Sequence, residues 1–80
     1  MSRSMVFKLK CKDKLDDLLL TFKLIKEFEN DDKVIYENND MRVSYDKGCV
    51  VRVLVFNGNN ETLVEKLREY FYGEEYKNIQ

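Results

Sequence analysis

One stretch of the sequence decides the fold: CVVRVLVF, residues 49–56, in which every position except Arg52 is apolar. A strand that is apolar on both sides is typical of the middle of a sheet. Asp46-Lys47-Gly48 precedes it and is a tight-turn sequence, in which Gly48 is free to adopt a positive φ. We therefore predict a central strand over 49–56, joined by a hairpin to the segment before it.

Two further segments alternate between apolar and polar residues, which is the period of a half-buried strand. In 41–46, Met41, Val43 and Tyr45 alternate with polar neighbours. A short extended piece, 34–36, comes before it, and a turn sequence, 38–40, separates the two. The segment 5–12 has an apolar side and a lysine-rich side: Met5, Phe7, Leu9 and Cys11 lie on the first, and Val6, Lys8, Lys10 and Lys12 on the second.

Two segments have the three- and four-residue apolar spacing of amphipathic helices. The first is predicted over 13–28, with Asp13 as its N-cap and a polar loop, 30–32, after it. The second begins at Asn60, and Gly73 is its predicted stop. The inner faces of the two helices are Leu15, Leu18, Leu19, Phe22, Ile25 and Phe28 in the first, and Leu63, Val64, Leu67, Tyr70 and Phe71 in the second.

The predicted order of elements is strand, helix, strand, strand, helix. A right-handed crossover from the first strand to the second leaves room for 49–56 between them. We therefore expect an α+β fold, a three-stranded antiparallel sheet with both helices packed on one face. No proline and no repetitive linker divides the chain, so we predict a single domain over 1–73 and a polar C-terminal tail over 74–80.

Composition argues against several classes of protein. Lys and Arg number 14 against 15 Asp and Glu, so the net charge of −1 does not indicate a nucleic-acid partner by bulk electrostatics. The chain has no His and only two Cys, which argues against a zinc site and removes the commonest acid–base catalyst. We expect no metal, no cofactor and no enzymatic activity. No apolar run approaches the ~20 residues of a membrane helix, so we expect a cytoplasmic protein with reduced thiols.

Cys11 and Cys49 both continue apolar alternations, so burial as structural residues is the favoured interpretation. Antiparallel pairing of the strands that carry them brings the two positions towards each other. A cross-strand disulfide is therefore the alternative, which a reducing cytosol disfavours.

The side of the sheet away from the helices is the most informative feature for function. Its cations alone indicate a solvated face, but the apolar residues beside them are unusual in a monomer. We predict a homo-oligomer interface formed by Val6, Val50, Leu54 and Phe56. The alternative is a small nucleic-acid-binding protein, with Phe56 or Tyr45 stacked on a base. Its phosphate contacts are then Lys8, Lys10, Lys12, Arg42 and Arg52.

The chain also resembles a known family, the small dimer-forming subunits of the KEOPS complex, which have about this length and the same order of elements. The matching run is Met41-Arg42-Val43-Ser44-Tyr45-Asp46-Lys47-Gly48, continued by Val50 to Val55, a polar break and Glu61-Thr62-Leu63. Two family features, an arginine–serine pair before the hairpin and an asparagine–serine pair in the last helix, are replaced by Glu37-Asn38-Asn39 and Arg68-Glu69. The resemblance implies a non-catalytic subunit that dimerises, bridges a kinase-like partner and supports threonylcarbamoyladenosine modification of transfer RNA.

Overall fold

The computed structural model describes residues 1–9, 12–46, 48–71 and 75–77 of the chain. Within these ranges, four strands follow one another between the two helices. The elements are β1 (Arg3–Lys8), α1 (Lys12–Thr21), β2 (Ile25–Glu29), β3 (Lys33–Glu37), β4 (Met41–Asp46), β5 (Val50–Val55), α2 (Glu61–Tyr70) and β6 (Glu75–Lys77).

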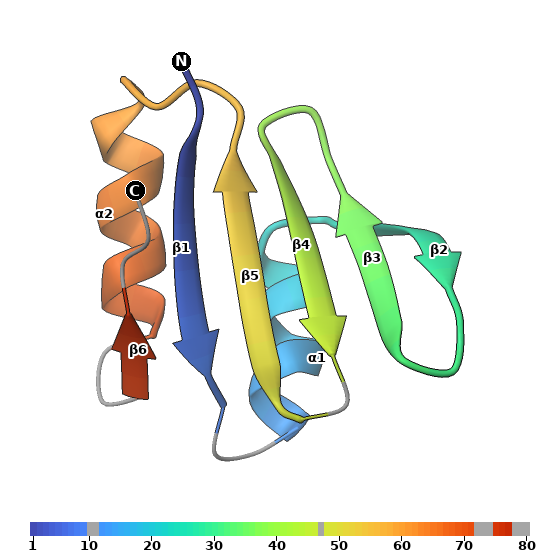
Figure 1. Ribbon diagram of the computed structural model, residues 1–80. Coiled ribbons are helices and arrows are strands. Elements are labelled where there is room, and N and C mark those ends of the chain that lie inside the picture. Colours follow the sequence, from blue (N-terminus) through green and yellow to red (C-terminus); the bar gives the residue numbers. More distant parts are fainter. Residues whose placement is uncertain (10–11, 47, 72–74, 78–80) are drawn as a thin grey trace.

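The strands form one antiparallel sheet of six strands in the order β2-β3-β4-β5-β1-β6. Figure 1 shows both helices behind this sheet, α1 near β5 and β4 and α2 on the β1 side. β5 lies between β4 and β1, which confirms the central position predicted for 49–56. The predicted three-stranded sheet is wrong, because β2, β3 and β6 also belong to it. β6 lies in the segment expected to be a polar tail, and it pairs with β1.

The first helix ends at Thr21 and does not continue to residue 28 as predicted. Lys23 has a φ of 54°, so the chain leaves the helix through a left-handed residue. The N–H groups of Lys23 and Leu24 donate to carbonyls of the last helical turn at 3.4 and 3.0 Å, which is the Schellman arrangement. Glycine usually occupies this left-handed position. Because Lys23 occupies it here, the sequence gives no signal for the end of the helix. Ile25 and Phe28 therefore continue the helical spacing but lie on β2.

The predicted hairpin between β4 and β5 is present, but its left-handed residue is Cys49 and not Gly48. Cys49 has a φ of 67°, and its N–H donates to the carbonyl of Asp46 at 3.1 Å. The N–H of Gly48 donates to the carboxylate of Asp46 at 2.9 Å. Asp46 thus holds the turn with both its backbone and its side chain, in the manner of an Asx turn.

The core lies between the helices and the side of the sheet that faces them. Alternate residues of β1, β4 and β5 enter it, as the pleat of a strand requires. Phe7 of β1 stacks on Phe71 at the end of α2, with ring centroids 3.9 Å apart and planes 11° apart. The buried apolar residues are Met5, Phe7, Leu9, Leu15, Leu18, Met41, Val43, Val51, Val53, Val55, Val64, Leu67 and Phe71.

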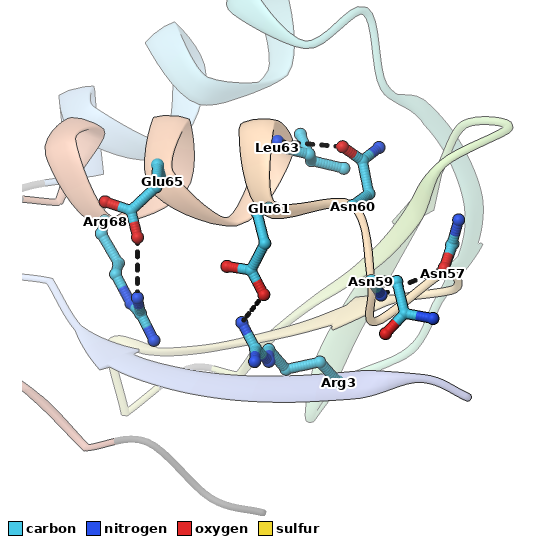
Figure 2. A network of polar contacts seen from close by, with 8 residues as sticks. All are labelled: Arg3, Asn57, Asn59, Asn60, Glu61, Leu63, Glu65 and Arg68. Atoms are coloured by element: carbon cyan, nitrogen blue, oxygen red, sulfur yellow. Dashed lines mark hydrogen bonds and ion pairs between the residues drawn. The ribbon is translucent and has the colours of Figure 1, made fainter.

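The start of α2 is tied to β1 (Figure 2). Asn60 caps the helix, as predicted, since its side-chain oxygen accepts the N–H of Leu63 at 3.2 Å. Glu61 in the first turn points towards Arg3 of β1, and its Oε1 lies 3.4 Å from the Nη1 of Arg3. Both side chains of this contact lie near the surface, so it positions the helix more than it stabilises it.

Tyr70 connects the two helices. Its hydroxyl lies 2.7 Å from the Oδ2 of Asp17 and 3.0 Å from the carbonyl oxygen of Lys14, so its single proton is shared between two acceptors on α1. The Nζ of Lys14 lies 4.8 Å from the centre of the Tyr70 ring. Burial raises the pKa of Tyr70 well above its ordinary value, and the hydrogen bond to Asp17 and its negative charge act in the same direction.

Tyr70→Phe is expected to lower the free energy of unfolding by about 1–2 kcal/mol near pH 8, because a hydrogen bond to a carboxylate is lost. Above pH ~10 the unfolded tyrosine ionises while the folded one stays protonated, so its contribution falls as pH rises towards the raised pKa. The difference in the free energy of unfolding between wild type and variant therefore becomes smaller by pH ~11. Urea denaturation at both pH values measures it. Burial also raises the pKa values of Tyr36 and Tyr45. Both residues are present in wild type and variant, so their contributions cancel in the difference.

Candidate binding surface

The side of the sheet away from the helices, here called the open face, is the candidate binding surface. Its side chains alternate with those of the core along each strand, and antiparallel pairing aligns them in three rows across the sheet. On β1 to β5, the first row is Ser4, Leu54, Arg42, Glu37 and Ile25; the middle row is Val6, Arg52, Ser44, Ile35 and Phe28; the third row is Lys8, Val50, Asp46 and Lys33. β6 continues the middle row with Lys77 and the third row with Glu75. Neither helix lies over these rows (Figure 1).

A depression of about 200 Å³ lies in the open face over β1, β5 and β4. Two arginines and two serines contribute to its wall, together with apolar residues. The lining residues are Ser4, Met5, Val6, Arg42, Ser44, Arg52, Val53 and Leu54. In this hollow predicted apolar contacts, Val6 and Leu54, meet predicted cations, Arg42 and Arg52.

The open face is basic, although the chain as a whole has a net charge of −1. On β1, β3, β4 and β5 its cations, Lys8, Lys33, Arg42 and Arg52, outnumber its carboxylates, Glu37 and Asp46. β6 adds one residue of each charge at register positions of the same rows, Lys77 and Glu75. The Nε of Arg42 donates to Glu37 at 2.7 Å, which compensates one cation. Arg52, in the central strand, forms no ion pair with any residue that the structure describes.

The edges of the sheet are less suited to pairing than its face. β2 is exposed along its whole length, but its register with β3 shifts between Lys26 and Phe28. The Nζ of Lys26 lies 2.9 Å from Glu29, whose hydrogen bond and charge raise the pKa of Lys26. Bulges and charged side chains are the usual protection of an edge strand. At the opposite edge, β6 has only three residues.

Three of the four predicted interface residues lie on the open face. Val6, Val50 and Leu54 are half-buried there, and Val6 and Leu54 line the depression. Phe56 follows the end of β5 and is 37% exposed. Their contact with a second copy stays a prediction.

Only some of the predicted phosphate contacts lie on the open face. Lys8, Arg42 and Arg52 are exposed on the open face. Lys12 was expected on the same strand side, but this is wrong because β1 ends at Lys8 and Lys12 is the first residue of α1. Lys10 lies outside the described residues.

Tyr45 and Cys49 differ from their predicted roles. Tyr45 packs against the core on the helix side, where burial raises its pKa, so it does not present its ring to a base. Its hydroxyl lies 3.9 Å from the Sγ of Cys49. Cys49 is exposed and not buried, because the left-handed turn ends the alternation that predicted its burial. Cys11 lies outside the described residues, so the disulfide stays a prediction.

Sequence reasoning missed the open-face residues of β2 and β3. Ile25 and Phe28, which are 66% and 47% exposed, were assigned to the inner face of the first helix. Ile35 was placed in an isolated extended piece, although it pairs with Ser44 and Phe28. The loop sequence Asn30-Asp31-Asp32 between two short apolar segments is the available signal for this hairpin.

Residues 1–9, 12–46, 48–71 and 75–77 contain no cluster of three side chains of the types that bind metals. Neither of the helices found in those ranges has the length and apolar character needed to cross a membrane. Comparison of the chain with protein-family models, with curated proteins and with solved structures finds no match.

Proposed function

We propose that this chain is a non-catalytic assembly module that dimerises through the open face of its sheet. The observation that carries the proposal is the order of residue types in the three rows. In the proposed dimer the open faces of two copies face each other, and the twofold axis lies between the two sheets, perpendicular to the strands. This axis places each strand over the same strand of the other copy, and the first row of one copy over the third row of the other. Such a pairing is isologous, so each contact occurs twice.

This arrangement makes the two faces complementary. Leu54 lies over Val50 of the second copy, so apolar side chains meet. Arg42 lies over Asp46, and Lys33 lies over Glu37. Opposite charges placed face to face fix the register and orientation of an interface. Sheets packed in this way lie about 10 Å apart.

The size of the face agrees with a dimer. Five strands spaced by about 4.8 Å and about 20 Å long present roughly 500 Å² per copy. A pair therefore buries about 1,000 Å², which is the lower limit of specific protein interfaces. An 80-residue chain has a small core, and association is a common way to add stability at this size.

Charge exchange tests the orientation of the two copies. Lys33→Glu is expected to raise the dimer dissociation constant about tenfold, because two attractive contacts become repulsive. Combining Lys33→Glu with Glu37→Lys restores opposite charges and is expected to recover most of the affinity. Sedimentation equilibrium at low ionic strength, where surface charges are least screened, provides the measurement.

Glu37→Lys alone is the matched control, since it breaks the same contact and also the ion pair with Arg42. It is expected to weaken the dimer at least as much as Lys33→Glu. If the double variant is weaker than either single variant, the copies do not pack with this axis.

A finer part of the proposal is that the dimer serves a transfer-RNA modification complex of the KEOPS type and bridges its kinase-like subunit in the cytoplasm. It is supported by the sequence resemblance and by the order β1, α1, β4, β5, α2, to which the β2–β3 hairpin is an addition. Co-elution of the chain with such a kinase-like subunit is its test. Separate elution of the two proteins at micromolar concentration counts against it.

A further inference from the structure

Arg52 occupies a special position in the proposed dimer, so the role inferred for it rests on the proposed function. It lies in the middle row of the open face, between Val6 and Ser44 on the neighbouring strands. The twofold axis maps the middle row onto itself, so Arg52 of one copy faces Arg52 of the other. On β1 to β5, every other charged residue of the rows meets an opposite charge, except Lys8, which lies over the neutral Ser4. Lys77 of β6 shares the middle row but lies at the edge of the sheet, two strands from Arg52.

On β3, β4 and β5, the strands on one side of Arg52 and its own, no carboxylate of the open face is left to compensate this pair of arginines. Glu37 is engaged by Arg42 at 2.7 Å. Asp46 accepts the N–H of Gly48 at 2.9 Å and lies over Arg42 of the second copy. Two guanidinium groups brought together in a closed interface, away from water, repel each other more strongly than they do in solution.

The depression supplies space and hydrogen-bond donors at this point. Its volume of about 200 Å³ is several times the roughly 30 Å³ that one water molecule occupies. Ser4, Ser44 and Arg42 line it together with Arg52, and Val6 and Leu54 contribute apolar surface. A planar guanidinium with neighbouring hydroxyls is a typical donor set for a tetrahedral oxyanion.

We infer that the depression binds a phosphate group, free or as a phosphomonoester, which both Arg52 side chains share, and that dimerisation depends on this anion. With sheets about 10 Å apart, arginine side chains from opposite faces are long enough for both to reach a common ligand in the depression. The bound anion converts the like-charge contact between the two arginines into two attractive ones. The phosphate concentration then determines the fraction of the chain that is dimeric.

The experiment compares wild type with Arg52→Leu by sedimentation equilibrium, with and without about 10 mM phosphate. Sodium chloride keeps the ionic strength constant, so general screening is equal in all samples. Phosphate is expected to lower the wild-type dimer dissociation constant at least tenfold. Arg52→Leu is expected to dimerise in phosphate-free buffer and to show no response to phosphate, because the repulsion and the anion ligand are both removed. Arg68→Leu, on the helix side, is the matched control and keeps the wild-type response.

The outcomes separate the two proposals. A wild-type dimer that is equally tight with and without phosphate overturns this inference and leaves the proposed dimer intact. A wild-type monomer in both buffers, with no heat of phosphate binding in calorimetry, overturns both. A parallel sample contains a single-stranded oligonucleotide of about ten residues in place of phosphate. If one copy binds it tightly and phosphate produces no dimer, the open face is a nucleic-acid surface and the inference is wrong.

Discussion

Replacing Phe7 by alanine is expected to lower the free energy of unfolding by about 3–5 kcal/mol, which is the usual cost of removing a buried aromatic ring. Phe7 is 1% exposed and stacks on Phe71, so the substitution leaves a cavity between β1 and the end of α2. A chain of 80 residues has a total stability of roughly 4–12 kcal/mol. The variant should therefore lose a large share of its stability, and at the lower end of this range it is partly unfolded at room temperature. Urea denaturation followed by far-UV circular dichroism measures the change.

Phe56→Ala is the matched control for this prediction. The same side chain is removed, but Phe56 is 37% exposed and lies beyond the end of β5. Its expected cost to the monomer is below about 1 kcal/mol. Equal losses for the two variants would show that the Phe7–Phe71 stack is not the centre of the core.

The parts of the fold that sequence analysis predicted correctly have strong local signals. The apolar run of β5 predicted a strand with neighbours on both edges, and β5 does lie between β4 and β1, although its outward residues are only half-buried or exposed. Asn60 stands directly before an apolar stripe, and its side chain satisfies a free N–H group of the first helical turn. In both cases the residues that carry the signal are neighbours in the chain.

The parts of the fold that sequence analysis missed depend on residues whose type does not indicate their conformation. Lys23 is left-handed without being glycine, so nothing in its residue type marks the end of α1. Ile25 and Phe28 are three apart, a spacing that a helix and a bulged strand both allow. The β2–β3 hairpin joins the sheet because β3 pairs with β4, and this tertiary contact outweighs local propensity.

The candidate site was predicted in composition but not in arrangement. Alternation alone identified Val6, Arg52 and Leu54 as residues of one face, and the structure brings them together in the depression. The rows need the register of five strands, two of which were absent from the predicted sheet. The complementarity of Lys33 with Glu37, which carries the proposed dimer, was therefore not visible in the sequence.

Leu54→Asp is expected to abolish the dimer while the monomer stays folded. In the proposed interface Leu54 packs over Val50 of the second copy, and burial of a leucine contributes about 1.5–3 kcal/mol. The contact occurs twice, and the substitution also places a carboxylate in a closing apolar contact. The dissociation constant should rise at least 100-fold, on the order of 3–6 kcal/mol. Size-exclusion chromatography with light scattering at ~100 μM measures the mass.

The fold should survive this substitution because Leu54 points away from the core, whereas its neighbours Val53 and Val55 are fully buried. Leu20→Asp is the matched control, since Leu20 is 80% exposed on α1, an element on the other side of the sheet. It should leave both the mass and the circular dichroism spectrum unchanged. A Leu54→Asp protein that remains dimeric removes the open face from the interface. Unfolding of that variant, with Leu20→Asp intact, would instead place Leu54 among the residues on which the monomer's own stability depends.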